Sequence, residues 1–125
     1  MIKFRYIYSN GKGIKVFFYT LVEVENFVVY DDLMQKVPDG FKLISRDRFT
    51  GLKDINKTDI FERDITKFNN KSLLIEFRDT HACFSAVEKV NGALDLHYNL
   101  RKDMAENRLE VVSNTHIEML RVERE

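Results

Sequence analysis

The chain has 125 residues, enough for one or at most two compact units with a core that needs no metal or disulfide. Hydrophobic residues make up 44% and charged residues 32%, and there is one proline, which excludes a disordered tail, a collagen-like repeat and a proline-rich linker. Twenty basic residues balance twenty acidic ones. A dedicated nucleic-acid binder usually carries a basic excess, and this chain has none.

The sequence also predicts the compartment. No apolar stretch approaches the ~20 residues of a membrane-spanning helix. The N-terminal residues are typical of a strand rather than a signal peptide, and the single cysteine, Cys83, has no partner in the chain for a disulfide. We therefore expect no membrane association and a reducing compartment, the cytoplasm.

The N-terminal part is dominated by strand patterns. Ile2–Tyr8 alternates apolar with charged side chains, and Asn10 with its neighbouring glycines predicts a tight turn at 9–13. Ile14–Val24 predicts a strand covered on both faces, because both faces carry apolar residues. Asn26–Tyr30 is a further short β-prone run.

One helix is expected in this part of the chain, at Asp31–Lys36. Asp31 is placed to cap the free N–H groups of its first turn. Val37 ends it, because the residue before Pro38 is pushed out of helical backbone angles.

The rest of the chain continues as short strands with one more helix. The expected strands are Phe41–Ile44, Phe49–Leu52, Thr58–Phe61, Ser72–Arg78, Ala82–Val90, Leu94–Leu100 and Leu109–Val112, and the expected helix is Arg101–Asn107. This pattern predicts a mainly β fold of many short antiparallel strands, including a small SH3-like barrel, with one or two short helices. We expect a single domain over 1–125, with an N-terminal β subregion at 1–48 and a small barrel at 49–125 as its candidate internal division.

Cations and aromatic rings alternate at Lys3–Tyr6 and at Arg46–Phe49, a pattern that single-strand nucleic-acid binders also show. Successive side chains of a strand point to opposite faces, so Lys3 and Arg5 lie opposite Phe4 and Tyr6. An ordinary two-sided strand is therefore the favoured interpretation.

A long central segment, Phe49–Phe68 (FTGLKDINKTDIFERDITKF), resembles the signature of the YopX family of phage and prophage proteins. The start, Ile2–Arg5, resembles the opening strand of that family, and Glu110–Asn114 resembles its closing strand. The resemblance implies an intracellular protein of a bacterial host, of unknown function, with a β-rich fold. It carries over no catalytic residue.

Some positions depart from the family pattern. Lys57, Arg63 and Ser113 stand where the family commonly has glycine, and the proline expected near Met119 is missing. These are backbone positions, so the departures concern turn geometry rather than chemistry. We expect Asn56 and Lys57 to form the centre of a type I′ hairpin turn, with positive φ at both.

Two segments of the sequence offer groups that could bind a metal ion. Asp54–Asp59 resembles the start of a calcium loop, but Asp59 occupies the position that requires glycine, and Ile65 the position that requires a bidentate glutamate. A hairpin is favoured there. His81 and Cys83 would share a strand face and offer two ligands, but no Cys-x-x-Cys accompanies them, so a structural cysteine is favoured.

Two histidines and a pair of carboxylates are the candidate catalytic groups. His97 and His116 lie near no recognised nucleophile, zinc or phosphate motif. Glu62 and Asp64 would share a strand face as a carboxylate pair, but the sequence shows no sugar-stacking ring beside them. We assign no catalytic, cofactor-binding or metal-binding residue, and we expect no enzyme activity.

The favoured function is a non-enzymatic binding or assembly module that self-associates as a homo-oligomer. The chain is rich in aromatic residues and carries no net charge to keep copies apart. The alternative is an accessory factor that binds nucleic acid through a small β-barrel. A hydrolase built on scattered carboxylates is the third hypothesis, and a host or phage protein is a further candidate partner.

Overall fold

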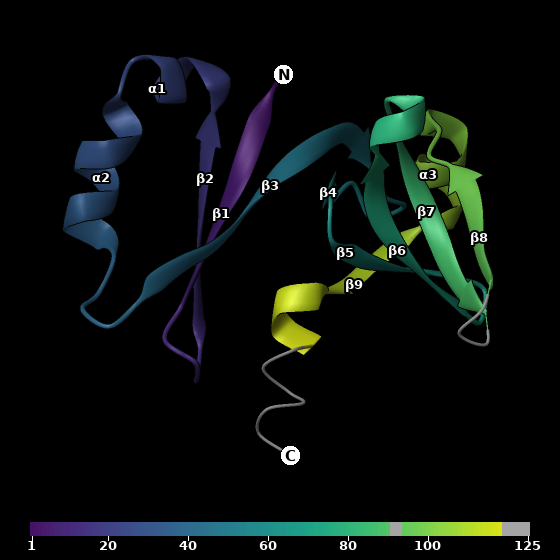
Figure 1. Cartoon of the computed structure of the whole chain (residues 1–125). Coiled ribbons are helices and arrows are strands. Elements are labelled where there is room, and N and C mark those ends of the chain that lie inside the picture. Colours follow the sequence, from purple (N-terminus) through teal and green to yellow (C-terminus); the bar gives the residue numbers. More distant parts are fainter. Residues whose placement is uncertain (91–93, 119–125) are drawn as a thin grey trace. The chain divides into compact units, whose positions relative to one another are not determined.

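The computed structural model of the protein describes residues 1–90 and 94–118 (Figure 1). The residues group into two compact units. The first contains Met1–Phe49 and the described residues from His116 onward, and the second contains Thr50–Thr115. No helix in the described ranges is long and apolar enough to cross a membrane.

The first unit is built on three strands and two helices. These elements are β1 (Lys3–Ser9), β2 (Ile14–Thr20), α1 (Leu21–Glu25), α2 (Val28–Lys36) and the first part of β3 (Lys42–Lys53). β1 lies in the middle and pairs antiparallel with β2 and β3. β3 continues into the second unit, where it neighbours β4 (Asp59–Phe61), so the sheet order is β2-β1-β3-β4.

Alternating side chains on β1 and β2 build the core of this unit. Tyr6 and Tyr19 are buried with their rings edge to face, 5.3 Å between centroids, and Val29 of α2 packs against them. This confirms the predicted strand and the predicted faces of β1: Phe4 and Tyr6 point to the helices and Arg5 to the other side.

The predicted strand Ile14–Val24 ends earlier than expected, at Thr20. Thr20 and Glu23 form a capping box, in which the threonine hydroxyl accepts from the Glu23 N–H and the Glu23 carboxylate accepts from the Thr20 N–H. This local signal overrides the β-branched residues that follow, so 21–25 is helical.

The predicted strand at Asn26–Tyr30 is also wrong, because α2 begins at Val28. Packing of Val29 in the core outweighs the low helix propensity of these β-branched residues. Its end at Lys36, before Val37 and Pro38, was predicted correctly.

The expectation that both faces of β2 are covered is wrong as well. Tyr19 is buried on the helix side, whereas Val16 and Phe18 on the opposite face are 37% and 58% exposed. One face of this strand therefore belongs to the core, and the other presents apolar side chains to solvent.

The second unit is a five-stranded antiparallel sheet with one helix. Its remaining elements are β5 (Asp64–Phe68), β6 (Lys71–Arg78), the 3₁₀ turn η1 (Asp79–His81), β7 (Cys83–Val90), β8 (Leu94–Asn99), α3 (Lys102–Arg108) and β9 (Glu110–Asn114). The strand order is β8-β7-β6-β5-β9. The core cluster, in which α3 packs on the sheet, consists of Ile60, Leu73, Ile75, Ala86, Ala105 and Leu109.

The mainly β prediction is confirmed, and most expected strands occur within a few residues of their predicted bounds. The predicted small SH3-like barrel does not form. Among the described residues, β8 and β9 are the two edges of an open sheet and do not pair with each other. The strand β5 had no separate prediction, because its sequence lies inside the long central segment.

The hairpin between β3 and β4 turns at Asp54. The Lys57 N–H donates to the Asp54 carbonyl at 3.0 Å, and the Asp54 N–H donates to the Thr58 carbonyl at 2.9 Å. Lys57 has φ 65°, as predicted, but Asn56 keeps a negative φ. These bonds define a type I turn followed by a left-handed residue, not the predicted type I′ turn.

A second expected glycine position behaves like Lys57. Arg63, in the turn from β4 to β5, has φ 69°. Its N–H donates to the Ile75 carbonyl and its own carbonyl accepts from Thr115 N–H, so the surrounding backbone holds this conformation. Ser113 has a negative φ and lies beside a β-bulge in β9. Two of the three departures from glycine therefore fall on left-handed residues.

We predict that Lys57→Gly raises the free energy of unfolding by about 0.4–1 kcal/mol. The lysine Cβ makes the left-handed conformation costly by about 1 kcal/mol, and the added freedom of glycine in the unfolded chain offsets part of the gain. A denaturant titration should show a higher midpoint with an unchanged slope.

The matched control is Asn56→Gly, in the same turn but with a negative φ. It should lower the midpoint, because glycine there adds only unfolded-state entropy. A Lys57→Gly variant with the same or lower stability than the wild type would show that position 57 is not strained.

Candidate functional site

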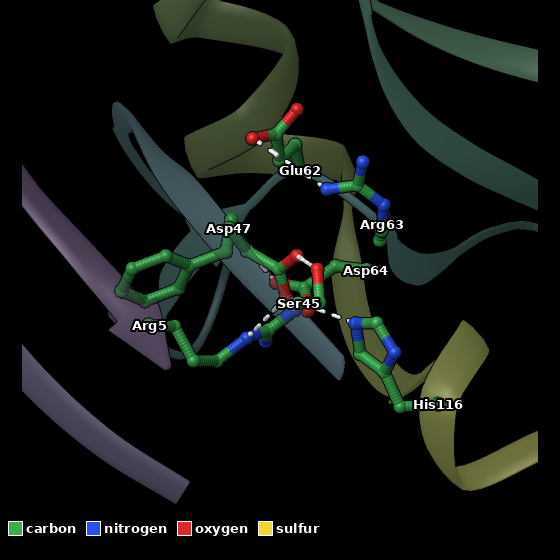
Figure 2. Close-up of polar contacts among 8 residues, drawn as sticks. Arg5, Ser45, Asp47, Glu62, Arg63, Asp64 and His116 are labelled. Atoms are coloured by element: carbon green, nitrogen blue, oxygen red, sulfur yellow. Dashed lines mark hydrogen bonds and ion pairs between the residues drawn. The ribbon is translucent and has the colours of Figure 1, made fainter. Parts of the chain in front are cut away.

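Four polar side chains of the first unit meet in its interior, and we refer to Arg5, Ser45, Asp47 and His116 as the Asp47 cluster (Figure 2). β1 supplies the arginine, β3 supplies the serine and the aspartate, and the histidine lies in the helical turn at 115–118. Asp47 is fully buried, and Arg5 and His116 are 6% and 7% exposed. Charged side chains are rarely so buried unless they are paired.

The contacts of the Asp47 carboxylate explain how it is held there. Oδ2 accepts from Nε and Nη2 of Arg5 at 3.0 and 2.7 Å. Oδ1 accepts from the Ser45 hydroxyl at 2.6 Å. His116 Nε2 lies 3.1 Å from Oδ2, and because a carboxylate only accepts, this contact requires a proton on Nε2.

These contacts keep the carboxylate charged. Burial by itself raises the pKa of Asp47, because it disfavours the charged form. The hydrogen bonds from His116, Ser45 and Arg5, together with the arginine charge, outweigh burial and lower this pKa to about 2. The Asp47 carboxylate is therefore ionised throughout the neutral range.

The geometry of the cluster does not form a nucleophile relay. The Ser45 hydroxyl donates to the carboxylate and not to the imidazole, so no base is aimed at it. The carboxylate and the imidazole face each other in the interior rather than a solvent-filled cleft. This arrangement supports a structural role, in which the cluster holds together β1, β3 and the 115–118 turn.

A second polar contact attaches α2 to the sheet. The buried Tyr19 hydroxyl donates to Asp32 Oδ2 at 2.6 Å, and Lys36 pairs with the other oxygen at 3.1 Å. Burial and the bond to Asp32 raise the pKa of Tyr19, and the Tyr19 bond and Lys36 lower the pKa of Asp32. The helix is thus fixed in place by its inner face while its outer face stays free to carry apolar residues.

Large apolar side chains are exposed on the outer side of this unit. On α1, on α2 and in the two residues between them, the large apolar side chains that are at least 48% exposed are Val22, Phe27, Val28, Tyr30 and Met34. Phe27, at 82% exposed, also has a left-handed φ of 59°. With Val16 and Phe18 on β2, they make this unit a candidate surface for contacts with another protein.

The metal ligands considered from the sequence do not assemble in the structure. His81 lies in η1 and is exposed, whereas Cys83 begins β7 and is half-buried, with Ala82 between them in a left-handed conformation. The two therefore do not share a strand face as expected. In residues 1–90 and 94–118, no three His, Cys, Asp or Glu side chains form a group that could hold a metal ion.

The other sequence candidates have structural contacts. Asp54 Oδ1 accepts from the N–H groups of its own turn, as the hairpin interpretation requires, and Oδ2 accepts from Val111 at 2.8 Å. The expectation that Glu62 and Asp64 share a strand face is wrong, because they flank the left-handed Arg63 in a turn. Figure 2 shows Glu62 paired with Arg63, and Asp64 caps the Phe61 N–H. His97 is exposed on β8.

The sequence indicates Arg5 as a strand residue and His116 as a lone histidine, but no pattern in it singles out Asp47 or brings these three residues together. They are separated by 42 and 69 positions, and no local spacing connects residues that far apart. The structure pairs Arg5 with Asp47 across the neighbouring strands β1 and β3, but Asp47 lies between the strands expected from the sequence, so no local signal indicated this pairing.

Comparison with known proteins gives one match at the level of a family. The chain is similar, over residues 7–118, to the family described as YopX protein. No curated protein matches it.

We predict that protonation of Asp47 destabilises the protein as the pH falls from about 4 to about 2. The pKa is about 2 in the folded protein and ordinary in the unfolded chain, so the charged cluster stabilises fully above the unfolded value of about 3.9. Denaturant unfolding at pH 7, 4 and 3 should show a loss of about 1 kcal/mol by pH 3 from this group, roughly half of its full effect.

The variant Asp47→Asn lacks this titration and should show a flatter pH dependence, from a starting stability lower by about 3 kcal/mol or more at pH 7. Asp39→Asn, at an exposed aspartate in the turn before β3, controls for the general loss of a carboxylate. Parallel pH profiles for the wild type and Asp47→Asn would contradict the prediction.

Proposed function

The chain belongs to the YopX family, and from this premise we propose that it is a non-enzymatic binding module that acts as a homo-oligomer in the cytoplasm of a phage's bacterial host. Family membership suggests a phage-type protein whose function is not defined. The observation that carries the proposal is that β2, among the described residues, pairs on one side only and carries exposed apolar side chains beside its other edge.

The sheet edges differ in how well they are protected. Of the edge strands in the described residues, β4 has three residues, β9 has five and carries a bulge against β5, and β8 has six. β2 has seven residues and pairs with β1 in an uninterrupted register from Ile14 to Thr20. Short strands and bulges protect an edge against pairing with another chain, and β2 has neither.

The side chains of β2 also favour a second copy as the partner. Lys15 is its single charged residue, so charge repulsion between two β2 strands is small. Two antiparallel copies of one strand satisfy a two-fold axis, in which the same patch serves both partners. The exposed Val16 and Phe18 would then pack across the joined sheets.

The hypothesis of nucleic-acid binding through stacked bases has weaker support. Arg46 lies over the rings of Phe4 and Tyr6, at 5.3 and 6.0 Å from their centroids. Tyr6 is buried and Phe4 packs against the core of this unit, so neither ring offers a platform for bases.

We predict that the wild type elutes as a dimer, with twice the 14.8 kDa mass of one chain, in size exclusion coupled to light scattering at tens of micromolar. Phe18→Lys adds a charge beside the β2 edge and should weaken association at least about tenfold, with an unchanged melting temperature. A wild-type mass of one chain at these concentrations would overturn the proposal.

The control is Val112→Lys, the same kind of substitution at a residue 50% exposed on β9, the edge of the other sheet. It should leave the mass unchanged. Loss of the dimer in Val112→Lys but not in Phe18→Lys would place the interface on the wrong strand and contradict the choice of β2.

A further inference from the structure

A depression of about 460 Å³ lies in the second unit, between α3, β8 and the turn that joins β5 to β6. All of its lining residues belong to Thr50–Thr115. Its volume is in the range of pockets that hold small molecules, roughly 300–1,000 Å³.

The inner wall of the depression is apolar and rigid. Leu73 is 1% exposed and belongs to the core cluster of the unit, and Phe68 and Met104 pack against that cluster. The ring of Tyr98, which is 38% exposed, adds an aromatic side chain from β8. A flat apolar group would meet two aromatic rings and a methionine here.

The rim of the depression is cationic. Lys71, Arg101 and Arg108 line it, with Asp103 as its one carboxylate, in a chain whose net charge is zero. His97 also lines it. Positive charge is therefore concentrated at this site, and an anion would be attracted to it.

Two of these cations form ion pairs with long N–O distances. Arg101 pairs with Asp103 at 3.7 Å, and both side chains are largely exposed, whereas Lys71 pairs at 3.6 Å with Glu88, whose side chain is 20% exposed. An exposed pair such as Arg101–Asp103 contributes about 0–1 kcal/mol, so an anion can replace Asp103 there at little cost. The Arg108 guanidinium lies over the Phe68 ring, 6.0 Å from its centroid.

The Arg108–Phe68 pair combines both kinds of recognition in one place. An arginine stacked on a ring keeps its planar fork of N–H donors available at its edge, which suits a phosphate or carboxylate. The phenyl and guanidinium planes also suit a second flat ring. The pocket thus offers an anion site directly beside a stacking surface.

We propose that this depression binds a small anion that carries a planar ring, with a nucleoside monophosphate as the representative of the class. The phosphate contacts Arg108 and the neighbouring Lys71 or Arg101, and the ring packs against Phe68 and Tyr98. This site does not depend on self-association through β2.

Isothermal titration of the full-length protein with AMP, adenosine and inorganic phosphate tests the proposal at low salt. AMP should bind at least tenfold more tightly than either adenosine or phosphate, because only AMP contacts both the ring surface and the cations. Arg108→Glu should weaken AMP binding at least tenfold, and its melting temperature should confirm that it folds.

The control is Lys67→Glu, which changes the charge by the same amount. Lys67 is exposed on β5, next to Phe68 in sequence but on the opposite face of the strand. This variant should bind AMP as the wild type does, and so should Phe18→Lys. If Arg108→Glu and Lys67→Glu weaken AMP binding equally, the loss comes from the change in overall charge, and the proposed site is wrong.

Two further outcomes would also overturn it. One is the absence of AMP binding at millimolar concentration. The other is binding of a single-stranded oligonucleotide without binding of AMP, since this indicates a surface that follows a nucleic-acid backbone rather than a pocket. If Phe18→Lys abolishes dimers but still binds AMP, this supports a binding site in the depression that is independent of dimerisation through β2.

Discussion

A buried carboxylate must be paired, and this requirement organises the first unit. Asp47 has no access to solvent, so the side chains that solvate it have to be brought to it from β1, from its own strand and from the 115–118 turn. Each of these segments is thereby held in a defined position. The helices then need only cover the aromatic face, and their outer residues are not used in the core.

The same arrangement explains why one unit shows so much apolar surface. Its sheet buries an aromatic layer on one side and a polar cluster on the other, so exposed residues such as Val16, Phe27 and Met34 contribute little to its core. In the second unit α3 covers the sheet, and its large core side chains are almost completely buried. This contrast is a further reason for the proposal that the exterior of the first unit contacts another molecule.

Most of the fold could be predicted from the sequence, because alternation, turn residues and Pro38 are local signals. The errors occur where tertiary contacts or caps decide: Thr20 begins a helix within a β-branched run, and Val29 is helical because the core needs it. The positive φ of Lys57 was predictable because the expected residue there is glycine. The Asp47 cluster was not, because its members are distant in the chain and none forms a motif.

The path of the chain also sets an order of assembly during translation. Thr50–Thr115 leaves the ribosome as one uninterrupted stretch, so the second unit has all of its strands before His116 is synthesised. Asp47 is made earlier, with Arg5, but its imidazole partner arrives only after the whole inserted segment. The contact between His116 and Asp47 can therefore form only after the whole intervening segment has been synthesised.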